Sequence, residues 1–459
     1  MTITGSILNV LRDGNVQFLP DGALACDAAG VIAYAGPRKG LPAHLAPAAR
    51  PSGGIILPPF LDAHIHIPQH PIRGRFMEGV EDNPPLGRLL AGLNRNVFPT
   101  ESKCSDDAYT RATVQAFLED TLAKGVVGGA AYMTVHPRAV RIALEMLPET
   151  WSVGLVLMNM NCPEYLRTDE KTLEKDVRAL AAAFGKRLIV TDRFAVAVDT
   201  PLRKRAAKLA EELGLRMQTH LNEQRAEKAF VEKALYPGQS YTGVYQADGL
   251  MDREPILAHC IHMTRSELEM LKRSRGAVAH CPTSNTLLGS GVMKVPDFLD
   301  FQIPYAICTD VGASPTTSML AEMSQYVKVH APFGPWGSPS DALFRSTLAP
   351  AQILGLDQTL GSFEVGKPMS FIEVEAGEIF HGASADEAIQ LGLLGLPEAQ
   401  VRQFCAGSYR DALEQLRQAG LDHGAALTLL EDDVRQTAHR LNHKVLSVTL
   451  SGKEVFRRG

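Results

Sequence analysis

The chain has 459 residues, of which 45% are hydrophobic and 21% charged, a balance typical of a globular rather than a disordered protein. Its formal net charge of −5 provides no basic field for a polyanion, which argues against nucleic acid or an anionic membrane as the main partner. A small-molecule ligand is therefore expected.

The start of the chain shows no pattern of a targeting segment. Residues 1–10 lack a basic stretch followed by a long apolar run, and no segment approaches the roughly 18 uninterrupted apolar residues of a membrane helix. The seven cysteines are scattered and include no Cys-x-x-Cys pair, which argues against a disulfide framework or a cysteine-based zinc site. We expect a cytoplasmic protein with reduced thiols and no membrane contact.

Both ends of the chain predict β-structure. Residues 1–54 contain Gly-Asn and Asp-Gly turn dipeptides between short β-like segments, and residues 446–456 have the pattern of a hairpin. We expect residues 1–54 and 362–459 to meet in one small β-domain. Within the second part, residues 384–430 are helix-prone, rich in Ala, Leu, Glu, Gln and Arg.

Between these ends, short apolar runs alternate with amphipathic stretches, as in parallel strands joined by crossover helices. The strand candidates are residues 55–66, 125–134, 151–161, 187–198, 215–222, 255–262, 276–281 and 304–310. The clearest helix candidates are residues 106–124, 171–185, 201–214 and 264–275. Eight such units predict an α/β fold, a TIM-type (β/α)8 barrel over residues 55–361, although the alternation alone equally allows an open doubly wound sheet.

The first strand candidate ends in a pair of histidines. His64 and His66 follow the apolar residues 55–61, and side chains two apart on a strand share one face. Both imidazoles can therefore bind the same ion, and imidazole is a good ligand for zinc. An isolated His-x-His is more often an ordinary surface or core pair, so the prediction depends on the rest of the chain.

Three later strand candidates end in groups that can complete a metal site. His220 ends the fifth, His259 the sixth and Asp310 the eighth, and barrel closure would bring them together. His64, His66, His220 and Asp310 fit as ligands that leave a position for water. Glu223, three residues beyond His220, is a candidate general acid and base.

Each of these residues has an alternative structural explanation. Glu223 could be a carboxylate at a helix N-terminus, favoured by the helix dipole. His259 could be an interior histidine with satisfied hydrogen bonds. Asp310 could be an N-cap or turn residue, since Val-Gly follows it. Their shared position at strand ends favours the catalytic interpretation.

The residues lie in five segments: residues 58–66 (PPFLDAHIH), 219–223 (THLNE), 257–260 (LAHC), 280–291 (HCPTSNTLLGSG) and 309–312 (TDVG). Together these segments resemble the amidohydrolase superfamily and, within it, most closely the guanine deaminases. Gln69 after the first motif, and Arg193 with Phe194 on the fourth strand candidate, narrow the resemblance further. It covers roughly residues 55–366.

The resemblance implies hydrolytic deamination of guanine to xanthine and ammonia by a metal-activated water. Asp310 would bind the metal and help deprotonate the water. Glu223 would protonate the ring nitrogen and carry a proton to the leaving amine, and His259 would polarise the new hydroxyl group.

The resemblance also implies a substrate pocket. Gln69 and Arg193 would read the polar edge of the purine, and Phe194 would pack against its ring. A planar guanidinium donates in fixed directions and stays charged, which suits recognition of an exocyclic oxygen. Asp192 occupies a position where the family usually has proline, and its carboxylate could reorient or partly neutralise Arg193.

The implied cofactor is one zinc ion per chain, with ferrous iron as the alternative, because both accept these ligands. The implied partners are a purine substrate and a second copy of the chain in a homodimer. Three alternatives remain: a mononuclear enzyme acting on 8-oxoguanine, a pterin, cytosine or a triazine; a ring-opening enzyme with two metals; and an inactive interaction scaffold. The ring-opening class uses a lysine on the fourth strand, and residues 188–194 contain none.

Overall fold

A computed structural model describes the chain except residues 81–86, 332–335, 378, 380–381, 399–400 and 402–422. The chain folds into two compact units. The first contains Met1–Asp62, Glu119–Val127 and Thr317–Gly459, and the second contains Ala63–Leu118 and Gly128–Thr316.

One sheet consists of parallel strands that follow one another in chain order. They are β6 (Phe60–His66), β7 (Val126–Tyr132), β8 (Trp151–Leu157), β9 (Leu188–Asp192), β10 (Arg216–Leu221), β11 (Ile256–His259), β12 (Ala277–His280) and β13 (Tyr305–Ile307). Beyond β13, the amide of Asp310 donates to the carbonyl of His64 at 3.0 Å, and the amide of His66 donates to Val311 at 3.2 Å. These bonds join the last strand to the first, and the predicted barrel is confirmed.

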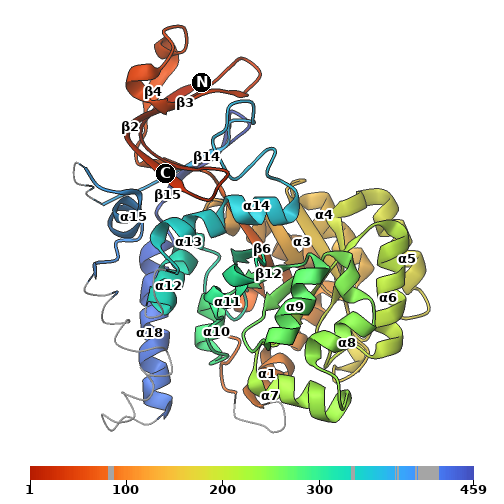
Figure 1. Ribbon diagram of the computed structural model, residues 1–459. Coiled ribbons are helices and arrows are strands. Elements are labelled where there is room, and N and C mark those ends of the chain that lie inside the picture. Colours follow the sequence, from red (N-terminus) through yellow and green to blue (C-terminus); the bar gives the residue numbers. More distant parts are fainter. Residues whose placement is uncertain (81–86, 332–335, 378, 380–381, 399–400, 402–422) are drawn as a thin grey trace. The chain divides into compact units, whose positions relative to one another are not determined.

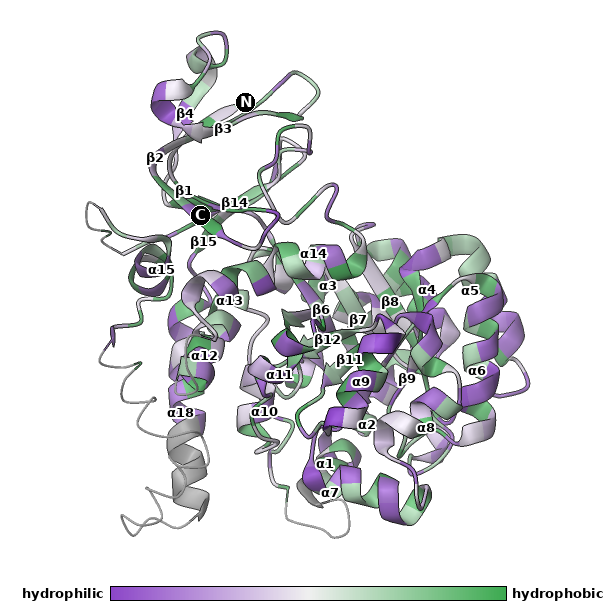
Figure 2. Ribbon diagram, in the orientation of Figure 1, coloured by the Kyte–Doolittle hydropathy of each residue, from purple (hydrophilic) through white to green (hydrophobic). Residues whose placement is uncertain are grey.

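Helices follow the strands and surround them (Figure 1). The longer ones are α3 (Asp107–Leu122), α4 (Pro137–Met146), α5 (Leu173–Phe184), α6 (Thr200–Leu213) and α9 (Arg265–Ser274). Shorter ones are α1 (Gly87–Gly92), α2 (Phe98–Glu101), α7 (Arg225–Phe230), α8 (Tyr241–Ala247), α10 (Pro282–Leu287) and α11 (Val295–Asp300). The strands are mainly hydrophobic, whereas α5 and α6 each carry polar and apolar faces (Figure 2).

The ends of these helices have clear local causes. In α6, the Asp199 side chain accepts a bond from the amide of Leu202, and Gly214 ends the helix with a left-handed φ of 64°. In α9, Thr264 and Glu267 form a reciprocal capping box. The predicted bounds at residues 201–214 and 264–275 agree with these helices to within a residue or two.

The first strand candidate needs a correction. Residues 55–66 do not form one barrel strand, because β5 (Ile55–Leu57) pairs with strands of the other sheet and β6 begins at Phe60. Pro58 and Pro59 separate the two strands. Proline lacks the N–H that a central ladder requires, so the continuous apolar run is divided between two sheets.

The second sheet is built from both chain ends, as predicted. Its order is β16-β15-β14-β5-β1-β2-β3, with β4 beside β1. These strands are β1 (Thr2–Val10), β2 (Val16–Cys26), β3 (Ile32–Pro37), β4 (Ala49–Pro51), β14 (Phe371–Val374), β15 (Val445–Leu450) and β16 (Lys453–Arg457). The predicted hairpin is β15–β16, which turns through Ser451 and Gly452 at φ values of 47° and 76°.

The first unit also contains α12 (Met319–His330), α13 (Pro339–Ser346), α14 (Leu348–Leu354), α15 (Ala385–Glu387) and α18 (His423–Leu441). The helix-prone prediction for residues 384–430 agrees with α15, with the π-helix at Ala388–Leu393 and with the start of α18. Its central part, residues 402–422, lies outside the described residues. None of the described helices combines the length and apolar character that a membrane span requires.

Candidate metal and substrate site

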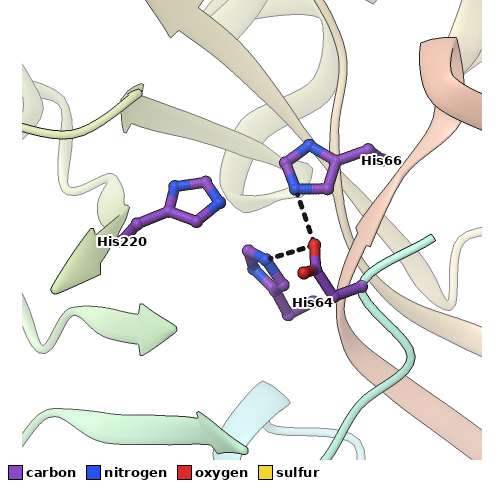
Figure 3. Close-up of side chains that lie close together, drawn as sticks. His64, His66 and His220 are labelled. Atoms are coloured by element: carbon purple, nitrogen blue, oxygen red, sulfur yellow. Dashed lines mark ion pairs between the residues drawn. The ribbon is translucent and has the colours of Figure 1, made fainter. Parts of the chain in front are cut away.

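Four side chains converge at the C-terminal ends of the barrel strands. His64 and His66 lie on β6, His220 lies on β10, and Asp310 lies three residues beyond β13. One ligand atom from each falls within 4.8 Å of all the others, and the three imidazole rings lie close together (Figure 3). Asp310 Oδ1 is 3.2 Å from His64 Nε2 and 3.1 Å from His66 Nε2. Three nitrogens and one carboxylate form a donor set suited to zinc or ferrous iron.

Neighbouring groups orient two of these side chains. His220 Nδ1 lies 2.6 Å from the carbonyl oxygen of Arg193, to which it must donate, and its Nε2 is therefore left as a ligand atom. Ser284 Oγ donates to Asp310 Oδ2 at 2.6 Å, while Oδ1 faces the histidines. The ring of Tyr132 packs against the cluster, 4.6 Å from the ring of His66 between centroids.

Burial sets the charge state of the cluster. It lowers the pKa of His66 to about 3 and holds the pKa of His220 well below its ordinary value. Burial alone would raise the pKa of Asp310, but hydrogen bonds from His64 and His66 outweigh it and keep that pKa well below the ordinary value. Neutral imidazoles and an ionised carboxylate are the forms that bind a cation.

The backbone is strained where these strands end. His259 and Asp310 have φ values of 72° and 50°, and Asn222, next to Glu223, has a φ of 52°. The left-handed region is unfavourable for residues other than glycine and is found repeatedly at functional sites. Here it turns the chain at the same end of three strands, where the polar side chains gather.

Glu223 and His259 lie beside the cluster. Glu223 Oε2 is 3.7 Å from His259 Nε2, and Ser290 Oγ donates to Glu223 Oε1 at 2.7 Å. Burial, and after it the negative charge of Asp310, raises the pKa of Glu223 to about 8. Asn285 Oδ1 lies 2.9 Å from His259 Nδ1 and accepts a hydrogen bond from it, so that Nε2 points at Glu223.

The helix-terminus explanation of Glu223 fits another residue better. At the start of α7, Glu227 Oε2 accepts hydrogen bonds from the backbone amides of Glu223 and Gln224, both at 3.1 Å. Its pKa is raised to about 7 by burial and by the charge of Glu223. Glu227 therefore provides the N-terminal carboxylate, and the side chain of Glu223 is directed into the pocket.

The cluster opens into one pocket that holds about 420 Å³ of empty space, including space open to solvent at its mouth. The predicted substrate residues Gln69, Arg193 and Phe194 all line it. The other lining residues are His66, Phe76, Leu89, Leu93, His220, Glu223, His259, Leu288, Asp310 and Ala313.

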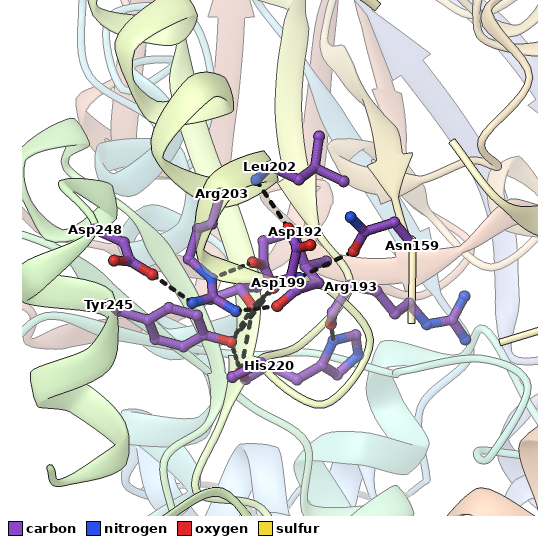
Figure 4. Close-up of polar contacts among 12 residues, drawn as sticks. Asn159, Asp192, Arg193, Asp199, Leu202, Arg203, His220, Tyr245 and Asp248 are labelled. Carbon is purple, nitrogen blue, oxygen red and sulfur yellow. Dashed lines mark hydrogen bonds and ion pairs between the residues drawn. The ribbon is translucent and has the colours of Figure 1, made fainter. Parts of the chain in front are cut away.

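The partner of Arg193 was not predicted. Arg193 Nη1 donates to both carboxylate oxygens of Glu101 on α2, at 2.8 Å each. Asp192 instead binds Arg203 at 2.7 Å, within a buried network around His220 and Tyr245 (Figure 4). Arg193 follows the last residue of β9, and its charge is paired with Glu101 while that of Asp192 is paired with Arg203, so the neutralising partner of Arg193 is Glu101.

Some residues that support the site could have been found in the sequence, and one could not. Ser284, Asn285 and Ser290 belong to the motif at residues 280–291, but their contacts depend on how that loop folds. Glu101 lies in a short helix, away from any strand end, and the sequence around it has no motif that indicates a functional site.

Comparisons with known proteins identify the family. The sequence model of the amidohydrolase family matches residues 55–393. This chain belongs to the amidohydrolase family. Guanine deaminase from Escherichia coli is 32% identical over 332 residues, 70% of this chain and 73% of that protein. Rat guanine deaminase is 31% identical over 335 residues, 68% of this chain and 71% of that protein.

The fold agrees with this assignment. The solved structure of E. coli guanine deaminase matches this amidohydrolase with a TM-score of 0.76, covers 100% of this chain and 99% of that chain, and is 26% identical to it. The resemblance to guanine deaminases, the barrel and the metal-dependent hydrolase class expected from the sequence are thus confirmed.

Proposed function

We propose that this amidohydrolase removes the amino group of guanine by hydrolysis and releases xanthine and ammonia. The main observation is that one pocket is lined by three members of the four-residue cluster, by the carboxyl group of Glu223, and by the polar side chains of Arg193 and Gln69. The similarity to guanine deaminases from a bacterium and a mammal supports guanine as the substrate.

His64, His66, His220 and Asp310 would hold one zinc ion, with ferrous iron as the alternative. Their convergent donor atoms fit such an ion, and the hydrogen bond from His220 Nδ1 to the carbonyl oxygen of Arg193 leaves Nε2 free to bind it. A bound divalent cation supplies a water of lowered pKa and stabilises negative charge.

Glu223 and His259 would move and hold protons during the reaction. Glu223 would take a proton from the attacking water and deliver it to the ring nitrogen beside the amino-bearing carbon, and would then carry the proton of the new hydroxyl group to the amine. The water oxygen forms the new C–O bond, and the C–N bond breaks as ammonia leaves. Neutral His259, whose Nδ1–H is bonded to Asn285, would accept a hydrogen bond from the new hydroxyl group at Nε2, while Asp310 would help to deprotonate the water.

Gln69, Arg193 and Phe194 would bind the purine. All three line the pocket, so their side chains can contact a ring placed against the cluster. Phe194 is 5% exposed and offers an aromatic surface for the purine. Arg193 offers N–H donors to a ring oxygen.

The direct test is an ultraviolet assay of guanine conversion to xanthine with the metal-loaded protein. The Glu223→Gln variant should lose at least roughly 100-fold in kcat, because it removes a proton carrier. Metal content, measured by elemental analysis, should stay near one ion per chain. Retained activity in Glu223→Gln would contradict the assigned role, and an inert wild-type protein that deaminates another heterocycle would contradict the substrate.

The metal content also separates this proposal from the ring-opening class. The barrel strand β9 reads Leu-Ile-Val-Thr-Asp and offers no lysine to bridge two metals. We therefore expect one ion per chain, and a measured value of two would favour the other class.

The homodimer and the cytoplasmic location stay predictions. The homodimer rests on the resemblance to guanine deaminases, and the location rests on the scattered cysteines of the sequence, which include no Cys-x-x-Cys pair. Light scattering on the purified protein tests the first, and fractionation of the source cells tests the second.

A further inference from the structure

Glu101 joins two of the residues that line the pocket. It is 1% exposed and lies on α2, and both its carboxylate oxygens accept bonds from Arg193 Nη1 at 2.8 Å. One of them also accepts a bond from Gln69 Nε2 at 2.9 Å. A single buried carboxylate therefore holds both polar side chains that the proposed function assigns to substrate recognition.

This contact determines which end of the Gln69 amide can meet a ligand. An ionised carboxylate only accepts hydrogen bonds, so the amide nitrogen must face Glu101. Gln69 lines the pocket, and Oε1, which lies beside Gly312, is the end of the amide left to accept a hydrogen bond from a ligand. Gly312 makes room for this orientation, because a Cβ atom at that position would lie only 2.5 Å from Gln69 Oε1.

The same contact leaves Arg193 as the donor of the pair. Nη1 is already bonded to Glu101, while the guanidinium has further N–H groups and lines the pocket. The charge of Arg193 is balanced by a buried partner, so a neutral ligand can approach it without introducing an unpaired charge.

We infer that Glu101 is a positioning residue that sets the polarity of the pocket: Arg193 donates, Gln69 accepts, and the site selects rings that present a carbonyl beside an N–H. This inference rests on the proposed function and defines its substrate class as aminated lactams. The C6 carbonyl and N1–H of guanine form such an edge. In 2,6-diaminopurine the edge is reversed, with an amino group beside an unprotonated nitrogen.

The test compares guanine with 2,6-diaminopurine, which carries the same 2-amino group. For each purine, kcat and KM are measured in the wild type and in the Glu101→Gln variant. The amide at position 101 both donates and accepts, so Gln69 can reverse its own amide. We expect kcat/KM for guanine to fall at least roughly 100-fold, mainly through KM, and kcat/KM for 2,6-diaminopurine to fall much less or to rise.

Glu267→Gln is the matched control. Glu267 is as deeply buried as Glu101 and binds Lys228 at 2.6 Å, but it does not line the pocket. This variant should lower the melting temperature and leave the ratio of the two kcat/KM values unchanged. Metal content and melting temperature are recorded for every variant, so loss of folded protein is separated from loss of selection.

A second variant keeps the test decisive if Glu101→Gln does not fold. Gln69→Met preserves the length of the side chain and the pair between Glu101 and Arg193, but removes the acceptor. The loss in kcat/KM should be at least roughly 10-fold larger for guanine than for 2,6-diaminopurine. If the wild type turns over guanine but the folded variants keep the same ratio of kcat/KM for the two purines, this inference is overturned and the proposed function stands. An absence of guanine turnover in the wild type would overturn the proposed function as well.

Discussion

At the residue scale, the carboxyl group of Glu223, the proposed proton carrier, accepts a hydrogen bond from the hydroxyl group of Ser290. Ser290 Oγ is 2.7 Å from Glu223 Oε1, and this bond opposes the burial that raises the pKa of Glu223 to about 8. The second oxygen, Oε2, faces His259 at 3.7 Å. Ser290 therefore both orients the carboxyl group and favours its ionised form.

The Ser290→Ala variant should shift the pH dependence of the reaction. The lost bond stabilises the ionised carboxylate, so its removal raises the pKa of Glu223 further. Because ionised Glu223 takes the proton from water, the acid limb of kcat/KM should move to higher pH by about one unit. A bound cation lowers the pKa in both proteins and does not reverse this direction.

The pH–rate profile measures this shift, and Ser346→Ala is the control. Ser346 is equally buried, but it donates to the backbone oxygen of Ala342 within α13. Its removal should leave the profile unchanged. A shift of the Ser290→Ala profile to lower pH would contradict the assigned contact.

At the scale of secondary structure elements, a buried arginine joins the strand ends that carry the site. Arg203 on α6 is 0% exposed and binds Asp192, the last residue of β9, at 2.7 Å, and Asp248 after α8 at 2.6 Å. Asp192 also accepts from Thr219 on β10 at 3.1 Å. Arg193 and His220 follow directly after these strand residues, so the network holds the backbone from which both project.

The Arg203→Met variant should destabilise the protein strongly. It leaves Asp192 buried without its cationic partner and Asp248 with only Lys204 at 3.8 Å, and removing one partner of a buried ion pair typically costs about 3 to 5 kcal/mol in the free energy of unfolding. Thermal or urea unfolding measures the loss. Arg178→Met provides the comparison, because Arg178 forms surface ion pairs with Glu174 and Glu212, and its loss should cost at most about 1 kcal/mol. Equal losses in the two variants would contradict the network's role.

At the scale of the whole chain, a second buried carboxylate joins segments that are far apart in sequence. Glu373 on β14 accepts bonds from Arg50 at 2.8 Å, from Ser52 at 2.9 Å and from Ser447 at 2.7 Å. Burial alone would raise its pKa, but these bonds outweigh it and lower the pKa to about 2. The Glu373 carboxylate thus holds together strands of this sheet that come from the N-terminal and the C-terminal parts of the chain.

Glu373 should make the free energy of unfolding depend on pH. Its pKa is about 2 in the folded protein and near 4.5 when unfolded, so its contribution is complete above pH 4.5 and is lost as the pH falls toward 2. The shift corresponds to roughly 3 kcal/mol. The Glu373→Gln variant should unfold at a lower temperature near pH 7 and differ less from the wild type near pH 3. A difference that grows on acidification would contradict this assignment.

The division into domains at residues 1–54 plus 362–459 and at residues 55–361 stays a prediction. Limited proteolysis followed by mass spectrometry would locate exposed connections near these boundaries. Cleavage confined to other positions would contradict it.

The alternation of apolar runs and amphipathic stretches was enough to predict the barrel, because a buried parallel strand and a helix that covers it each require their own hydrophobic pattern. The polar residues at the strand ends were likewise sufficient to predict that His64, His66, His220 and Asp310 lie together, since closure of a barrel brings those ends together. The division of residues 55–66 between two sheets was missed, because an apolar run does not reveal which strands it will pair with.

The sequence by itself thus determined the barrel, the group of His64, His66, His220 and Asp310, and the family. Tertiary structure alone decided which charges pair: Arg193 with Glu101, Asp192 with Arg203, and the helix-capping role of Glu227 beside Glu223. The physical reason is that hydrophobic patterns are local and periodic along the chain, whereas hydrogen bonds and ion pairs depend on distances of about 3 Å between groups that only the folded chain brings together.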